Sequence, residues 1–251
     1  MAFNVSADAY DRFMGRYSSR LAAQMADLAG VEAGQRVVDV GCGPGALTEE
    51  LVRRVGADAV AAADPSEPFV AAVAERFPGV DVRLASAEEL PFPDGTFDAA
   101  LAQLVVHFMA DPVRGLAEMA RVAREGGVVA ACVWDHESGQ TPIGTFWEVV
   151  REVGLRAEDE SDLAGVREGH LVQLLDEAGL RDVEGSVLQV RAEQESFEDW
   201  WQPFTLGVGP AGSYYAQLGE EQQREVRERC RERLCGPFTL DTRAWAARGI
   251  A

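Results

Sequence analysis

The sequence predicts an α/β protein with a mostly parallel sheet and helices on both faces of that sheet. Short β-branched or alanine-rich runs recur along the first half of the chain, and several end in Gly or Asp. Amphipathic segments long enough for a helix separate these runs. Parallel neighbouring strands require such helical crossovers, so strand and helix are expected to alternate. The 251 residues, 47 % of them hydrophobic, suit one domain with a sizeable core.

Five strands are expected in the first half, behind a helical leader. The leader is predicted within residues 7–29, with Leu21, Met25 and Leu28 on one face. The strands are expected at 36–40, 59–64, 80–85, within 96–106, and at 128–134. Helices are expected at 47–55, from Ser66 to Phe77, and from Asp111 to the Gly126–Gly127 pair.

The second half has a less regular pattern. Helices are expected at 141–154 and 170–180, and strands at 182–192 and 238–249. Residues 193–236, rich in aromatic and charged residues, lie between those two strands and are expected to form a helical cap over the C-terminal edge of the sheet. The prediction is a single domain, 1–251, with an N-terminal leader at 1–30 and this cap as an insertion.

Charge and cysteine content exclude several classes of function. The 42 acidic residues outnumber 23 basic ones, all of them Arg, and the net charge is −19. Nucleic acids and anionic membranes both favour basic surfaces, so neither is expected as a partner. No apolar run approaches the roughly 20 residues of a membrane span, and the N-terminus lacks the pattern of a secretory signal. The four dispersed cysteines lack metal-site spacing, which predicts a cytoplasmic location, reduced thiols and no metal.

The most informative motif is the segment Val37–Gly45, in which a predicted strand runs into Gly41, Gly43 and Gly45. Bare backbone can approach a ligand closely, and the amides that open the next helix favour anionic or polar groups. Glycine spacing alone is weak evidence, because a tight strand-to-helix turn also uses it. Asp64 ends the next predicted strand, where a carboxylate can accept hydrogen bonds from both ribose hydroxyls; a helix-capping Asp is the alternative.

With these segments in order, the sequence resembles the class I S-adenosylmethionine-dependent methyltransferases, and most closely their ubiquinone-biosynthesis-like, small-molecule branch. The resemblance rests on VVDVGCGPGALTEELV, AAADPSEPF, ASAEELPFPDGTFDAALAQLVVHF and REGGVVAACVW, and on the leader AYDRFMGRYS. It implies a Rossmann-like seven-stranded sheet whose last strand, 238–249, is antiparallel.

The resemblance also assigns cofactor contacts. Gly41, Cys42, Gly43 and Gly45 are expected beside the methionine part of S-adenosylmethionine, and Asp64, Pro65 and Ser66 around its ribose. Ser86, Ala87 and Glu88 are expected at the adenine. Many relatives carry Asp at the position of Ser86, so either Ser86 or Glu88 must take the contact with the adenine amino group. Gln103 would face the cofactor's amino group through its backbone carbonyl, and Tyr10, Arg16 and Tyr17 would close over the methionine end.

Methyl transfer from a sulfonium requires alignment, exclusion of water and, for some acceptors, a base. His107, just after the fourth strand, is the leading candidate for a general base, and His136, after the fifth, is the second; both alternatively only pack beside the pocket. Trp147, Trp200, Trp201 and Phe204 are expected to form an apolar acceptor pocket, or else the core of the cap.

The resulting expectation is a monomeric or homodimeric enzyme that methylates O, N or C of a small organic molecule and releases S-adenosylhomocysteine. A nicotinamide-dependent oxidoreductase is the first alternative, since it uses the same glycines and acid. The leader, the Ser86–Glu88 segment and the absence of any Lys for a Tyr/Lys pair disfavour it. A domain that binds the cofactor without transferring methyl is the second alternative.

Overall fold

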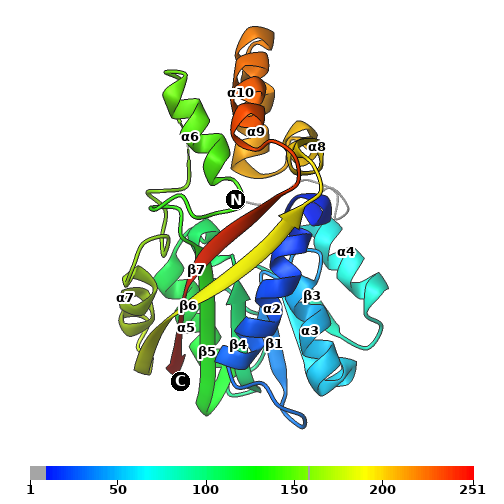
Figure 1. Cartoon of the computed structure of the whole chain (residues 1–251). Coiled ribbons are helices and arrows are strands. Elements are labelled where there is room, and N and C mark those ends of the chain that lie inside the picture. The colour runs from blue at the N-terminus through cyan, green and yellow to red at the C-terminus, as the bar shows by residue number, and fades with distance from the viewer. Residues whose placement is uncertain (1–9, 158) are drawn as a thin grey trace.

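The computed structural model describes residues 10–157 and 159–251, and it is built on one seven-stranded sheet (Figure 1). The strand order is β3-β2-β1-β4-β5-β7-β6. The strands are β1 (Val37–Val40), β2 (Val60–Asp64), β3 (Asp81–Leu84), β4 (Phe97–Gln103), β5 (Ala123–Trp134), β6 (Arg181–Gln194) and β7 (Phe238–Ile250). β7 lies between β5 and β6 and runs antiparallel to both, while the other paired strands are parallel. The predicted mostly parallel sheet with its last strand antiparallel is therefore confirmed.

The apolar runs become strands because both faces of the central sheet are covered. Every residue of β1 and β2 is buried. Strands buried on two sides require continuous rather than alternating hydrophobicity, which is the pattern of both runs. One face packs against α2 (Arg16–Leu28), α3 (Ala46–Val55) and α4 (Glu67–Arg76), and the other against α5 (Pro112–Val122) and α7 (His170–Glu177). Helices thus lie on both faces, as predicted (Figure 1).

The leader is helical as predicted over its described residues, and one predicted helix end is wrong. The leader is not one regular α-helix, because Asp11–Gly15 forms a π-helical turn ahead of α2; the prediction for residues 7–9 lies outside the described residues. The helix that begins after Asp111 ends at Val122 and not at Gly126, since Ala123 is already extended and pairs with Phe97. The glycine pair instead lies inside β5, with Gly126 at φ +76°, where the pairing register shifts.

The segment between β6 and β7 is helical. It contains α8 (Phe197–Trp201), the 3₁₀ turn η4 (Gln202–Leu206), α9 (Gly209–Gln217) and α10 (Glu220–Arg233). These helices stand with α6 (Gly144–Glu152) at one end of the sheet (Figure 1). Arg233 of α10 pairs with Glu148 and Glu152 of α6. The cap therefore combines residues before and after β6.

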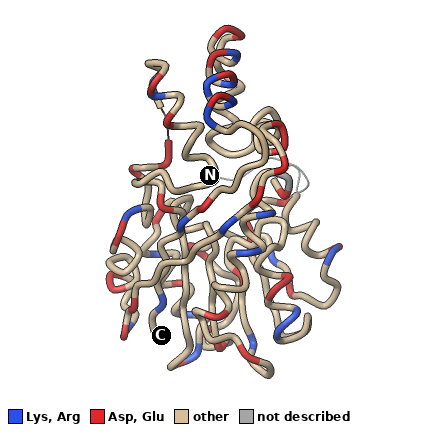
Figure 2. The backbone as a smooth tube through the Cα atoms, viewed as in Figure 1, with Lys and Arg blue, Asp and Glu red and all other residues tan. Residues whose placement is uncertain are grey.

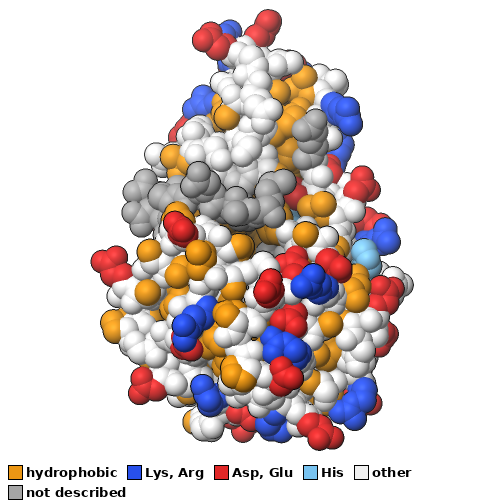
Figure 3. Space-filling model, turned by 180° about the vertical axis from the view of Figure 1, so that it is seen from behind, with side chains coloured by type: hydrophobic (Ala, Val, Ile, Leu, Met, Phe, Trp, Pro, Cys, Tyr) orange, Lys and Arg blue, Asp and Glu red, His pale blue; other side chains and the backbone are white. Residues whose placement is uncertain are grey.

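Charged residues are spread along the whole chain and form no continuous basic stripe in the described part (Figure 2). On the reverse face, acidic and basic side chains are interspersed with apolar atoms (Figure 3). Among the described residues, no helix combines the length and the apolar character that a membrane crossing needs.

Candidate active site

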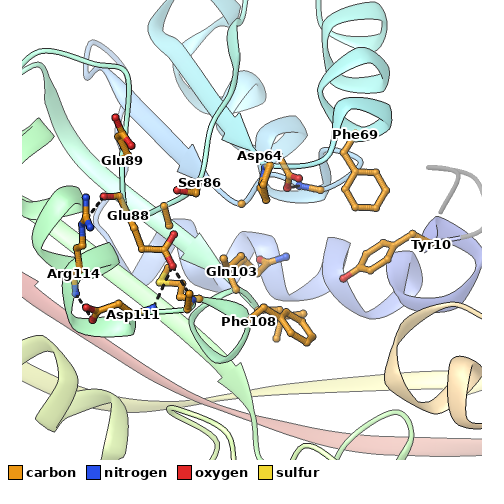
Figure 4. A pocket seen from close by; sticks show the side chains of 18 residues that line it. Tyr10, Asp64, Phe69, Ser86, Glu88, Glu89, Gln103, Phe108, Asp111 and Arg114 are labelled. Atoms are coloured by element: carbon orange, nitrogen blue, oxygen red, sulfur yellow. Dashed lines mark hydrogen bonds between the residues drawn. The ribbon is translucent and has the colours of Figure 1, made fainter. Parts of the chain in front are cut away.

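A cavity of about 480 Å³ opens at the carboxyl ends of β1, β2 and β4. Ligands of open α/β sheets bind at this edge, and the volume lies in the usual range of small-molecule sites, about 300–1,000 Å³. Figure 4 shows Tyr10 and Phe69 at one end of the cavity and Glu88 and Arg114 at the other. Asp64 lies between them.

The glycine loop follows β1 in a conformation that side chains resist. Gly41, Gly43 and Gly45 have φ of +72°, +52° and +98°. A Cβ at Gly41 would lie 2.5 Å from a methyl carbon of Val105, whereas a Cβ at Gly43 would meet no protein atom. Gly41 is thus required for packing, and Gly43 leaves backbone exposed to the cavity.

Asp64 holds this loop in place. Its Oδ2 accepts a hydrogen bond from the amide of Gly43 at 2.9 Å, and its Oδ1 accepts one from the amide of Ser66 at 2.8 Å. The side chain is only 6 % exposed, and burial raises its pKa while the two amide bonds oppose that rise. A carboxylate offers about four lone-pair sites, so two remain for ligand hydroxyls.

Glu88 fixes the opposite end of the cavity. Its Oε1 accepts hydrogen bonds from the amides of Ala110 and Asp111, at 2.7 and 3.3 Å. Burial acts to raise the pKa of Glu88, but these amides and the hydroxyl of Ser86 lower it below its ordinary value. The carboxylate therefore orders the 110–111 loop, and Ser86 and Ala87 form the cavity wall beside it (Figure 4).

Gln103 provides an unused acceptor. Its Nε2 donates to the carbonyl of Ser18 in the leader at 3.1 Å, and its Oε1 is buried without a hydrogen-bond partner among the described residues. The next residue, Leu104, has φ +62° and also lines the cavity. Residues other than glycine rarely adopt a positive φ, and those that do are found often at functional sites.

These groups fit S-adenosylmethionine. The cofactor carries ribose hydroxyls that match the remaining lone pairs of Asp64, and an ammonium group that matches the unpartnered Oε1 of Gln103. The glycine backbone and the wall at Ser86 and Ala87 leave room for the methionine and adenine parts. The fit extends over both ends of the cavity.

Not every predicted cofactor residue reaches the cavity. Nine of the predicted residues line it: Tyr10, Gly41, Gly43, Asp64, Pro65, Ser86, Ala87, Glu88 and Gln103. Cys42, Gly45 and Ser66 do not line it and lie in the same loops. Arg16 makes a two-point ion pair with Asp199 of α8, and Tyr17 accepts a hydrogen bond from Gln194 at 2.8 Å. Both leader residues join the leader to the cap instead of facing the cavity.

The two candidate bases lie together, behind the cavity wall. The ring of His107 packs against that of Phe108 at an interplanar angle of 42°, with centroids 3.8 Å apart, and Phe108 lines the cavity. The centroid of His136 lies 5.8 Å away from that of His107. Burial lowers the pKa of His107 well below its ordinary value, with a further decrease from His136, and burial lowers the pKa of His136 to about 4. Both rings are therefore neutral at pH 7.

The four predicted acceptor-pocket aromatics do not line the large cavity. Trp147, Trp200, Trp201 and Phe204 are each at most 4 % exposed and pack against neighbouring aromatic rings. Phe146 stacks on Phe204 in the same cluster, with centroids 4.9 Å apart. Of the two readings that the sequence left open, the structure favours the core of the cap.

Sequence reasoning missed several residues around the cavity: Phe69, Leu104, Val105, Phe108, Met109 and Arg114. They come from α4, the turn after β4 and the start of α5. All but Arg114 are apolar like any core residue, so no local signal marked them. Only the position of 104–109 directly after β4 pointed toward the ligand-binding edge.

The sequence matches known methyltransferases over its first half. A family model described as a methyltransferase domain matches residues 38–131. An uncharacterised methyltransferase of Mycobacterium bovis is 40 % identical over 103 residues, which cover 41 % of each chain. The chloroplastic 2-methyl-6-phytyl-1,4-hydroquinone methyltransferase 2 of Oryza sativa subsp. japonica is 41 % identical over 100 residues, or 39 % of this chain and 28 % of that protein. The matches thus span less than half of these relatives.

The fold agrees over nearly the whole chain. A solved structure of phosphoethanolamine N-methyltransferase 2 from Haemonchus contortus, in complex with phosphomonomethylethanolamine and S-adenosylhomocysteine, has a TM-score of 0.59. It covers 97 % of this chain and 56 % of its own, at 16 % identity, a level that shows the fold alone. The family match and the antiparallel β7 favour methyl transfer over the nicotinamide alternative, which would use the same glycines and Asp64. Over residues 38–131 the chain is similar to S-adenosylmethionine-dependent methyltransferases, and its sheet has the Rossmann-like order of the solved structures that it resembles.

Proposed function

We propose that this protein transfers the methyl group of S-adenosylmethionine to a small organic molecule. The observation that carries the proposal is the pairing of Asp64 with the glycine loop at the edge of the cavity. That pairing positions a buried carboxylate with free lone pairs beside exposed backbone. The acidic net charge and the hydroquinone named for one relative support a small neutral or cationic acceptor over nucleic acid.

In this proposal the chain acts mainly by positioning. The cofactor, when bound, supplies an electrophilic methyl on its sulfonium. Asp64 would orient the ribose, Gln103 would accept from the ammonium group, and Tyr10 would close the end of the cavity beside Phe69. The apolar walls at Leu104 and Phe108 would exclude water. Alignment of this kind is worth roughly 7–11 kcal/mol in favourable cases.

His107 is the proposed general base, with His136 as the alternative. Its Nδ1 is buried without a hydrogen-bond partner in the described part of the chain, so a lone pair or a proton is available there. The low pKa keeps the ring neutral and able to accept a proton, although it also makes the ring a weak base. In this role the ring would have to reach the cavity, from which Phe108 separates it.

The test is a binding comparison followed by a methyl-transfer screen. Titration calorimetry should show binding of S-adenosylhomocysteine on the order of micromolar and no comparable binding of NADH. Protein, labelled S-adenosylmethionine and fractionated small molecules from cell extract should then yield a labelled product. The opposite preference in calorimetry would refute the proposed cofactor site. Tight cofactor binding without any labelled product would favour a domain that binds the cofactor but transfers no methyl.

A further inference from the structure

The leader is tied to the cap at the point where β6 ends and the cap begins (Figure 1). Gln194, the last residue of β6, is a polar side chain in a residue that is only 1 % exposed. Its Oε1 accepts a hydrogen bond from Arg16 of α2, and its Nε2 donates to the hydroxyl of Tyr17 at 2.8 Å. Both polar ends of this buried amide therefore bind the leader, which fixes the position of the leader against β6.

Two further contacts strengthen this tie. The guanidinium of Arg16 makes its two-point ion pair with Asp199 of α8, at 2.7 and 2.9 Å. The ring of Phe13, in the π-helical turn, meets the ring of Phe204 at an interplanar angle of 80°, with centroids 5.5 Å apart. We call this set of contacts the leader–cap clamp. Its members are Phe13, Arg16, Tyr17, Gln194, Asp199 and Phe204.

The second half of α2 is anchored independently of the clamp. Leu21 and Met25 are fully buried in the core. Gln24 also binds β6, because its Nε2 donates to the carbonyl of Gln189 at 2.8 Å and its Oε1 accepts from the amide of the same residue at 3.3 Å. Apolar burial therefore holds the second half of the helix, whereas the leader–cap clamp holds its first turn.

That first turn lies between the clamp and the large cavity. Tyr10, on the other side of the π-helical turn, lines the cavity, and its ring meets that of Phe69 at 64° with centroids 5.5 Å apart. The carbonyl of Ser18 accepts from Nε2 of Gln103, another lining residue, at 3.1 Å. If the first turn of α2 moved away from the cap, Tyr10 would leave the cavity and Gln103 would lose its partner.

We propose that Gln194 is a positioning residue for cofactor binding, because its buried amide fastens the first turn of α2 to the cap and so keeps Tyr10 in the cavity. Gln194 itself does not line the cavity. The inference rests on the proposed function, since S-adenosylmethionine is the ligand whose affinity depends on the clamp. Arg16 then acts on the cofactor site through the leader and not by direct contact.

The coupling works in both directions. A ligand that needs Tyr10 in the cavity has an apparent affinity proportional to the fraction of molecules with a docked leader. By linkage, the same ligand makes the docked leader harder to open. Each hydrogen bond shifts such an equilibrium by roughly two- to tenfold. Loss of the two bonds at Gln194 is therefore expected to weaken cofactor binding by about tenfold or more.

The first experiment compares Gln194→Met with Gln24→Met in the full chain. Both substitutions remove a side-chain amide that makes two hydrogen bonds between α2 and β6, and both keep the length of the side chain. Titration calorimetry should show that S-adenosylhomocysteine binds about tenfold or more weakly to Gln194→Met, and as tightly to Gln24→Met as to the unaltered chain. Equal affinities in all three proteins, or an equal loss in both variants, would overturn the proposal. No binding to any of the three would refute the proposed cofactor, and the coupling with it.

The second experiment separates positioning from a general loss of stability. In Gln194→Met, amide hydrogen exchange should become faster in residues 10–17 and in α8, and stay unaltered in residues 21–28. An equal increase along the whole chain would show that Gln194 only stabilises the fold, and would overturn the proposal. In the unaltered chain, S-adenosylhomocysteine should slow exchange in residues 10–17 and in α8. Absence of that slowing would also overturn the proposal.

A double-mutant cycle tests the route through Tyr10. In Tyr10→Ala that end of the cavity is already lost, so adding Gln194→Met should weaken S-adenosylhomocysteine binding much less than it does in the unaltered chain. Full additivity of the two changes would show that Gln194 does not act through Tyr10. If Gln194→Met fails to fold, Arg16→Met loosens the same clamp from its more exposed side and should give a smaller loss of affinity in the same direction. The exchange measurement on the unaltered chain needs no substitution.

Discussion

Asp64 gives the sharpest test of the cofactor site, because one side chain holds both the loop and the proposed ribose position. Replacement by Ala removes the acceptor of two backbone amides, those of Gly43 and Ser66. A buried donor left without its partner costs about 1–3 kcal/mol. Gly43 is half-buried at the cavity and can recruit water, whereas Ser66 is buried. The expected loss in the free energy of unfolding is therefore about 1–3 kcal/mol for the pair.

Cofactor affinity should fall as well. Loss of the ribose contacts and of the ordered loop is expected to weaken S-adenosylhomocysteine binding by about 1–3 kcal/mol, or roughly 5- to 150-fold. Titration calorimetry measures the affinity, and urea unfolding measures the stability. Glu67→Gln, three residues along the chain at an exposed position, is the matched control. Unchanged affinity in a folded Asp64→Ala protein would refute the assignment of Asp64.

Three further predictions concern proton transfer, buried charge and the leader. His107→Ala should fold, retain cofactor affinity and lose about 10²–10⁴-fold in the rate of methyl transfer, and an unaltered rate would remove His107 as the base. Burial raises the pKa of Asp39 to about 7 from an ordinary 3.8, so the folded chain holds the proton longer than the unfolded one and stability falls as pH rises from about 4 to 7. Asp39→Asn should remove that decrease. The unfolding free energy of the variant minus that of the parent chain, both measured in urea, should therefore be about 1–4 kcal/mol larger at pH 8 than at pH 4. An equal difference at both pH values would contradict this. Arg16→Met should weaken the contact of the leader with Asp199 by only about 0.5–1 kcal/mol, since both side chains are about one-third exposed. Amide hydrogen exchange should become faster in α2 and α8. An unchanged exchange rate would show that the ion pair does not stabilise the leader.

The sequence alone determined the sheet and the loop at its centre. Strands buried on both faces must be continuously apolar, so the apolar runs that begin at Val37 and Val60 could be predicted as strands from the sequence. The turn after β1 requires a positive φ, as at Gly41, and the glycine spacing in the sequence shows this requirement. Asp64 ends β2, where its carboxylate accepts hydrogen bonds from the amides of Gly43 and Ser66. Parallel connections then place both at the same edge of the sheet.

Only the tertiary structure decided which of several plausible side chains face a ligand. Arg16 suits a cofactor carboxylate by chemistry, yet Asp199, 183 residues away, takes its guanidinium. The cap aromatics suit an acceptor pocket by composition, but Trp200, Trp201 and Phe204 are buried against one another. Glu160 had no sequence signal, because its burial depends on its position beside His136, which lies in the loop after β5. Residues far apart in the chain compete for the same partners, and a linear pattern does not record the outcome of that competition.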